Sequence, residues 1–173
     1  MAELQLLRAD HAPAVLAFET ENRDYFAAFI SDRGDDYFEH FNELHDLRLA
    51  EQESGEGAYY VLVDDDGSVL GRFNLIIEGD VAEVGYRVAE RAAGRGVATA
   101  AVQQLCRLAS RQHSLRTLKA ATPLGNTASQ RVLLNAGFVE VGPADPEDVG
   151  GKPGTRYQLE LKPEDCTRRM TAG

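Results

Sequence analysis

The sequence lacks most of the features that place a chain in a membrane, an export route or a disulfide scaffold. No apolar run approaches the roughly 20 residues that a membrane-spanning helix needs. The first residues, Met1 to Gln5, contain neither the basic nor the apolar stretch of an export signal. The two cysteines, Cys106 and Cys166, form no metal or redox motif. We therefore expect a cytoplasmic protein without a metal ion and without a membrane partner.

Positive charge is also scarce. The chain has 18 lysines and arginines against 28 aspartates and glutamates, which gives a formal net charge of −10. Nucleic-acid binding needs clustered positive charge, so we expect no nucleic-acid partner. The acidic surplus mildly favours a cationic substrate, such as an amine or a basic peptide, through long-range steering. High solubility is the simpler explanation of the same surplus.

The length of 173 residues, with 43% hydrophobic and 27% charged residues, is that of one globular domain. We expect a single domain over residues 1–162 and a flexible C-terminal tail at residues 163–173. Alternation and turn signals predict strands, and a period near 3.6 predicts helices. The predicted strands are residues 4–8, 58–63, 69–77, 81–88, 115–121, 138–141 and 156–161, and the predicted helices are residues 10–21, 37–53, 97–112 and 126–134.

A stretch rich in aromatic and acidic residues, Asn22 to Phe38, separates the first two predicted helices and follows neither period cleanly. It is either a packed connection between the helices or a wall that faces a substrate amine, since aromatics and acids together suit an amine that must be desolvated and oriented. His40 and His45, on the second predicted helix, do not have the spacing of a zinc site. We interpret them as surface or hydrogen-bonded histidines.

The chain turns from a strand into a helix at Gly94-Arg95-Gly96. Glycine has no Cβ, so another molecule can approach the backbone closely there. The following helix presents its first amides at the positive end of its dipole, which favours an anion and most often a phosphate. The stretch is one glycine short of a dinucleotide fingerprint, and Val97-Ala98 replaces the Lys-Ser or Lys-Thr pair of a Walker A loop. A glycine-rich turn that only caps an ordinary helix is the plainer alternative.

Two motifs together carry a resemblance to a known family. Arg91-x-x-Gly94-x-Gly96 resembles the acetyl-CoA pyrophosphate loop of the GNAT superfamily of N-acetyltransferases. About thirty residues later, the segment from Asn126-x-x-Ser129 to Gly137-Phe138 resembles the stretch that follows the fifth strand in those enzymes. The order and spacing of the two motifs are more specific than either motif alone.

With Glu83-Val84-Gly85-Tyr86 ahead of the glycine turn, the sequence looks like the branch of the ribosomal-protein alanine N-acetyltransferases (RimJ/RimL-like). Ala92-Ala93 is small where that branch often has an aromatic residue, and Ala89-Glu90 stands where Asp-Pro is frequent. These departures do not change the glycine turn or the helix amides that we expect to bind phosphate. They make the assignment to this branch less specific than the assignment to the superfamily. The resemblance covers about residues 58–161 and only in outline the two helices before them.

The resemblance implies a GNAT fold of the α/β (α+β) class, a mixed and strongly twisted sheet of about six to seven strands with helices on both faces. It implies acetyl-CoA as cosubstrate, with no metal. Arg95 either adds a charge beside a phosphate or is an exposed arginine at a helix start, and Asn126 either contacts the pantetheine amides or caps its own helix. The residues that the resemblance assigns to acetyl-CoA are Val88, Arg91, Gly94, Arg95, Gly96, Val97, Ala98, Thr99, Asn126 and Ser129.

Acyl transfer to an amine needs a neutral amine and a proton for the departing thiolate. Alternation puts Glu83 on one strand face with Gly85 and Arg87, about 16 Å from Val88 at 3.3 Å per residue, a reach comparable with an extended pantetheine arm. Glu83 is therefore a candidate catalytic base, unless it only pairs with Arg87 or a neighbouring strand. Ser129 is the candidate catalytic proton donor, unless it only caps its helix, and Tyr86 is the alternative donor.

An α-amine, with a pKa of about 7.7–8.0, is already partly neutral, whereas a lysine near 10.4 costs roughly 3–4 kcal/mol more to deprotonate. A single modest base therefore favours a protein N-terminal amine, from a ribosomal or another protein, as the acceptor. A small-molecule amine or an antibiotic is the alternative acceptor. A non-catalytic acyl-CoA-binding sensor and an unrelated phosphate-binding domain are the alternative functions. The sequence leaves the choice between monomer and homodimer open.

Overall fold

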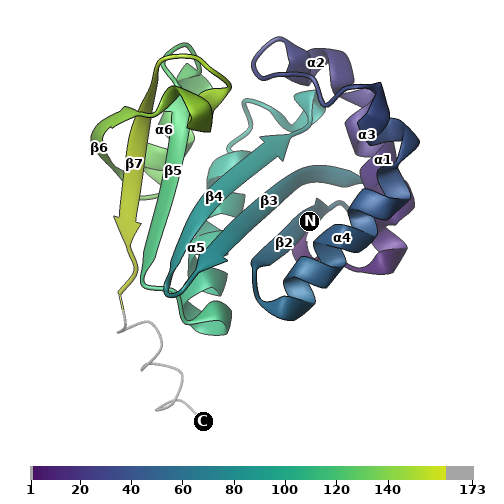
Figure 1. The fold of residues 1–173 in the computed structure, drawn as a ribbon, viewed down its shortest axis with the longest axis horizontal. Coiled ribbons are helices and arrows are strands. Elements are labelled where there is room, and N and C mark those ends of the chain that lie inside the picture. Colours follow the sequence, from purple (N-terminus) through teal and green to yellow (C-terminus); the bar gives the residue numbers. More distant parts are fainter. Residues whose placement is uncertain (1, 163–173) are drawn as a thin grey trace. The chain divides into compact units, whose positions relative to one another are not determined.

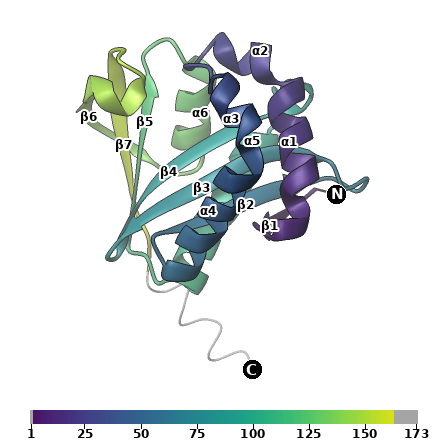
Figure 2. The ribbon, with the colours of Figure 1, turned by 45° about the vertical axis from the view of Figure 1, so that its right-hand side comes forward.

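The computed structural model describes residues 2–162, so the predicted tail at residues 163–173 lies outside the described part. Figures 1 and 2 show the arrangement of its helices and strands. Single 3-10 turns lie at Ala9–His11, Glu90–Ala92 and Pro146–Val149. The strands are β1 (Glu3–Leu6), β2 (Gly57–Val63), β3 (Val69–Glu78), β4 (Val81–Val88), β5 (Thr117–Pro123), β6 (Val139–Ala144) and β7 (Gly154–Glu160), and the helices are α1 (Ala12–Glu21), α2 (Arg23–Ala27), α3 (Asp35–Glu39), α4 (Phe41–Ser54), α5 (Val97–His113) and α6 (Thr127–Asn135).

Seven strands form a mixed sheet in the order β1-β2-β3-β4-β5-β7-β6. The β1–β2, β2–β3, β5–β7 and β6–β7 pairs are antiparallel, and β4 and β5 are parallel. The expected mixed α/β sheet of six to seven strands is thus confirmed. The chain divides into two compact units, residues 1–76 with 85–98 and residues 77–84 with the described residues from 99 onward. The boundary of a single domain at residue 162 stays a prediction.

In the first unit, α1 and α4 lie side by side across the strands (Figure 2). Their apolar side chains meet those of β2 and β3, because alternate residues of a strand point to the same face of the sheet. The buried members of this core are Leu7, Val15, Phe18, Phe26, Phe41, Tyr59, Val61, Val69 and Ala89.

Two predicted helices of this unit differ from the structure. The helix expected to start at Asp10 begins at Ala12, because Asp10 lies in a 3-10 turn and its carboxylate pairs with Arg8 at 3.0 Å instead of capping the helix. The predicted helix over residues 37–53 is two helices, α3 and α4, which are separated by His40. His40 has φ −107° and ψ 23°, outside the α-helical region, and a period of 3.6 residues does not register such a break.

In the second unit, α5 buries one side, including Leu105 and Cys106. Burial raises the pKa of the Cys106 thiol to about 11, which agrees with a core residue and not with a nucleophile. Gly137 follows the end of α6 with φ 101°, a positive backbone angle that favours glycine just after a helix. Among the described helices, none is long and apolar enough to cross a membrane.

Candidate active site

The glycine turn lies in the first unit and leads directly from β4 into α5. Gly94 has φ 75° and Gly96 has φ 73°, so both adopt the left-handed conformation that favours glycine. A Cβ built at either glycine would meet no atom within 4 Å, so the space outside the turn is open. α5 begins at Val97, directly after this turn, and the first N–H groups of a helix have no partner within the helix.

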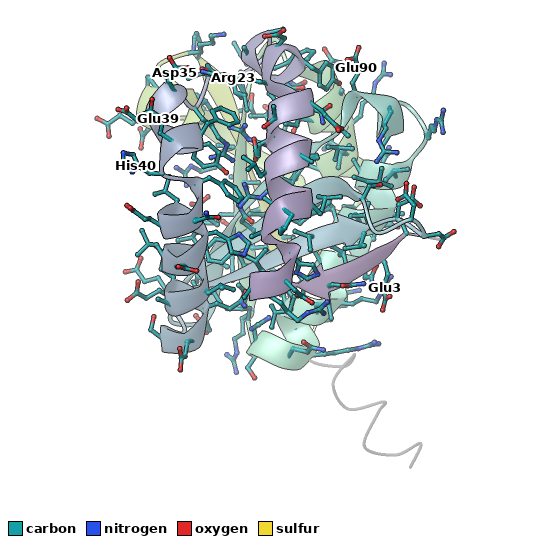
Figure 3. All side chains as sticks on the ribbon, turned by 90° about the vertical axis from the view of Figure 1, so that its right-hand side faces the viewer. Glu3, Arg23, Asp35, Glu39, His40 and Glu90 are labelled. Atoms are coloured by element: carbon teal, nitrogen blue, oxygen red, sulfur yellow. The ribbon has the colours of Figure 1, made fainter. Side chains whose placement is uncertain are left out.

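Hydrogen bonds fix the segment before the turn on both sides. The Ala89 N–H donates to Leu70 O at 2.8 Å, and the Arg91 guanidinium donates to Ser68 Oγ at 2.7 Å. The Glu90 N–H donates to Oδ1 of the buried Asn22 at 3.0 Å. Arg95 is exposed, and Glu90 is labelled close to the turn in Figure 3. The turn is thus held by main-chain and side-chain contacts that do not use its own amides.

The start of α6 lies in the second unit. Asn126 is the N-cap, and its Oδ1 accepts the Ser129 N–H at 3.2 Å. Asn126 therefore caps its own helix, which is one of the two roles expected for it, and both roles expected for the Ser129 hydroxyl stay predictions. Ser129 is half-buried in the first turn of α6, at the positive end of the helix.

Glu83 belongs to the same unit and is the last β4 residue in the ladder with β5, where it faces Lys119. Its carboxylate pairs with Arg156 of β7 at 3.6 Å, and Arg156 also pairs with Asp148 at 2.6 Å. The alternative prediction that Glu83 pairs with Arg87 is wrong, because Arg87 binds a different carboxylate. The Glu83 side chain is 52% exposed, so it is open to water and to a ligand.

That other carboxylate is Glu19, which the sequence analysis missed. Glu19 is 1% exposed, and three arginines surround it: Arg72 Nη1 at 2.9 Å, Arg33 Nε at 3.1 Å and Arg87 Nη1 at 3.4 Å. Burial by itself raises the pKa of Glu19, but the charges of the arginines outweigh it and hold this pKa below its usual value. Burial and the neighbouring charge of Arg33 lower the pKa of Arg87 to about 10.

A cavity of about 180 Å³ lies beside this cluster, within the first unit. Phe41 and Leu44 supply its apolar lining. Its polar lining comes from α3, α4, β3 and the loop before α3, and consists of Arg33, Tyr37, His45, Arg48, Arg72 and Asn74. The signal for this cavity was present in the sequence, because Arg72 and Asn74 alternate with apolar residues on β3 and therefore share one face.

Two acidic residues of the expected amine wall, Asp32 and Asp35, are already paired. Arg23 binds Asp32 and Asp35, each at 2.8 Å, and its guanidinium lies 4.5 Å from the centre of the Phe38 ring. Figure 3 shows Arg23, near the start of this segment, next to Asp35, near its end. The hydrogen bond from Arg23 lowers the pKa of Asp32 to about 2. Arg33 and Tyr37 of the same segment line the cavity.

The predicted site residues thus fall into two groups. Val88, Arg91 and the residues from Gly94 to Ala98 lie in the first unit, whereas Glu83, Thr99, Asn126 and Ser129 lie in the second. Within the described residues, no group of three or more histidine, cysteine, aspartate or glutamate side chains is arranged to hold a metal ion.

Known proteins with a similar sequence or fold are acetyltransferases, as the two sequence motifs predict. Residues 3–139 match the acetyltransferase (GNAT) domain family. The chain is 30% identical over 146 residues to a probable N-acetyltransferase, YjcK, of Bacillus subtilis, with 79% of each chain covered. The fold is similar to that of a ribosomal-protein-S5-alanine acetyltransferase from Vibrio fischeri, with a TM-score of 0.85, 19% identity and 93% of each chain covered.

A further similar structure is a spermidine N-acetyltransferase from Vibrio cholerae in complex with CoA and spermine. It has a TM-score of 0.75 and 18% identity, and the match covers 92% of this chain and 95% of that one. At these identities the two solved structures establish the fold alone. The chain belongs to the GNAT acetyltransferase family and is an acetyl-CoA-dependent N-acetyltransferase.

Proposed function

We propose that this enzyme transfers the acetyl group of acetyl-CoA directly to a protein N-terminal amine, in a complex that holds both substrates. The observation that carries the proposal is the turn in which Gly94 and Gly96 are both left-handed at the start of α5. The open space outside both glycines fits a pyrophosphate that approaches the main chain closely. The first amides of α5 donate to it, and Arg95, exposed in the turn, adds a positive charge beside it.

Acetyl-CoA supplies the acetyl group as a reactive thioester. β4 supplies main-chain groups up to Val88 for the pantetheine arm, because its ladder with β5 runs only from Val81 to Glu83 within the described part of the chain. Asn126 is committed to the Ser129 N–H through Oδ1, so its amide nitrogen is the group that serves a ligand.

Glu83 and Ser129 divide the proton transfers. The amine loses one proton as its nitrogen forms the bond to the carbonyl carbon, and Glu83 accepts this proton directly or through water. The carbon–sulfur bond breaks, and the Ser129 hydroxyl gives a proton to the departing thiolate at the positive end of α6. Water returns the proton held by Glu83 to the Ser129 oxygen, so both side chains recover their starting states. Glu83 is the one candidate base in this scheme, which supports an α-amine, already partly neutral near pH 7, rather than a lysine as the acceptor. A small-molecule amine is the second candidate, as the spermidine enzyme of similar fold illustrates.

The test is CoA release from acetyl-CoA with a panel of acceptors: ribosomal-protein N-terminal peptides, N-blocked peptides that contain lysine, polyamines and aminoglycosides. We expect turnover with a free N-terminus. Acetyl-CoA binding without turnover on any of these acceptors would instead support a non-catalytic sensor. Failure to bind acetyl-CoA would overturn the assignment of the glycine turn.

Ser129→Ala should lower kcat at least about tenfold on the best acceptor, because the thiolate then leaves without its proton donor. The dissociation constant of acetyl-CoA should stay the same, since the Ser129 N–H and its bond to Asn126 remain. Thr127→Ala, an exposed hydroxyl at the start of the same helix, is the matched control and should keep full activity. Equal rates for the two variants would remove Ser129 from the mechanism.

Glu83→Gln should lower kcat/KM about tenfold near pH 7, at the low end for general-base catalysis. The deficit should shrink toward pH 9, where most α-amines are neutral without help. Steady-state kinetics across this pH range measure both effects. Glu140→Gln, at an exposed position on β6, is the control and should change neither. A deficit that does not depend on pH would mean that Glu83 only positions Arg156.

A further inference from the structure

The cavity beside Glu19 has no role in the scheme above, although it is built from buried polar groups. Its volume of about 180 Å³ is below the roughly 300–1,000 Å³ of sites that enclose a whole ligand. It therefore suits one functional group of a larger acceptor. The walls consist of α3, α4, β3 and the loop before α3, all in the first unit.

The charge around this cavity is positive, in contrast to the chain as a whole. Glu19 provides one negative charge to Arg33, Arg72 and Arg87, so the cluster carries a surplus of two positive charges. Arg48, which also lines the cavity, is neutralised by Glu51 through two contacts of 2.7 Å. The surplus thus faces the cavity at Arg33 and Arg72, and guanidinium groups bind carboxylates well.

Two hydrogen-bond acceptors in the cavity lining lack a partner. Within residues 2–162, the buried atoms His45 Nδ1 and Asn74 Oδ1 have none. His45 is 4% exposed, and its Nε2 lies 3.0 Å from Arg8 O. A carbonyl oxygen only accepts, so Nε2 carries the hydrogen and Nδ1 is left as an acceptor. An unpaired buried acceptor is costly, so both atoms favour a ligand with N–H or O–H groups.

The cavity adjoins the strand that we assign to the pantetheine arm. β3 and β4 are antiparallel neighbours joined by a tight turn, in which Glu78 faces Val81. At the other end of the pair, the Ala89 N–H bonds to Leu70 O, which gives the same register. In this register Asn74 lies opposite Gly85. A Cβ at Gly85 would meet no atom within 4 Å, so space is open beside Asn74. Gly85 is two residues from Glu83 on the same strand.

From this arrangement we infer that the cavity is a specificity subsite for a carboxylate of the acceptor, which Arg33 and Arg72 bind while Asn74 and His45 accept hydrogen bonds from neighbouring N–H or O–H groups. The inference rests on the proposed function, because it takes the amine to react beside β4. It names the acceptor as an amine that bears a carboxylate. The carboxylate belongs either to a free amino acid or to an acidic side chain near a peptide N-terminus.

Calorimetric titration of the full-length protein in the presence of CoA tests the subsite without any need for turnover. One pair of ligands is alanine and alaninamide, which differ in the α-carboxylate. The other pair is Ala-Glu-Ala and Ala-Gln-Ala, both amidated at the C-terminus, which differ in a side-chain carboxylate, and spermidine is the cationic reference. We expect the acidic member of one pair to bind at least tenfold more tightly than its neutral partner and than spermidine.

Arg33→Gln should reduce that preference at least fivefold, and Glu19 keeps two arginines in this variant. Asn74→Asp, which places a negative charge in the cavity at nearly constant volume, should reduce it as well. Arg8→Gln, at an exposed arginine that pairs with Asp10, is the matched control and should leave the preference unchanged. A melting curve shows that each variant is folded.

Equal binding of the acidic and neutral members in both pairs, no binding by either member, or tighter binding of spermidine would overturn the subsite. CoA release is measured on the same ligands. Turnover without an acid preference would refute the subsite and leave the acetyltransferase assignment intact. Acid-selective binding without CoA release on any acceptor would support the subsite and refute the proposed transfer.

Discussion

Glu19→Gln is expected to lower the free energy of unfolding by about 3–5 kcal/mol, the range for removing one partner of a buried ion pair. Glu19 is 1% exposed and contacts Arg33, Arg72 and Arg87. Glutamine has nearly the same shape but carries no charge, so three guanidinium groups would face one another without a counter-charge. Urea denaturation of the two proteins at pH 7 measures the difference.

The same substitution has a pH signature with a defined sign. The pKa of Glu19 in the folded protein is below the usual value of 4.5. The stability that its charge contributes is therefore fully present above about pH 4.5 and is lost as the pH falls through the pKa of the folded state. The difference between wild type and Glu19→Gln should consequently be constant from pH 6 to 8 and should narrow below pH 4.5.

Glu39→Gln is the matched control for both measurements. Glu39 is exposed on α3 (Figure 3), so its substitution should change the stability by no more than about 0.5 kcal/mol. If Glu19→Gln behaved like this control, the buried cluster would contribute nothing to the fold.

Gly96→Val is expected to weaken acetyl-CoA binding about a hundredfold. Gly96 has φ 73°, and a β-branched residue in that conformation costs up to about 3 kcal/mol. Relief of this strain requires the turn to change its backbone angles, which redirects the first amides of α5. About 2.8 kcal/mol corresponds to the hundredfold loss, and calorimetric titration with acetyl-CoA measures it.

Gly67→Val separates backbone strain from ligand binding. Gly67 has φ 85° in the hairpin between β2 and β3, and a Cβ at this position also meets no atom within 4 Å. Both variants should therefore lose similar thermal stability, whereas only Gly96→Val should lose acetyl-CoA affinity. Equal affinities in the two variants would show that the glycine turn does not hold the cosubstrate.

Local chemistry in the sequence was sufficient for the parts of the site that depend on neighbouring residues. Only glycine adopts the backbone conformation of Gly94 and Gly96 without strain. Asparagine is a favoured N-cap residue, and Asn126 directly precedes α6. Both features could therefore be predicted from short stretches of sequence. The positions of the strands along the chain and the long helix α5 also follow from alternation and from a period of 3.6 residues. These features were sufficient to predict the family, which the match of residues 3–139 to the acetyltransferase (GNAT) domain family confirms.

The contacts between distant segments were decided only by the tertiary structure. Glu19 and Arg87 are 68 positions apart, and no local pattern pairs them. Likewise Glu83 meets Arg156 rather than Arg87, because strand alternation gives the face of a side chain but not which of several arginines reaches it. The sequence therefore determined the glycine turn, where the backbone acts and where we propose that acetyl-CoA binds. The cavity with surplus positive charge, where we expect the acceptor to be selected, exists because folding brings together side chains that lie far apart in the chain.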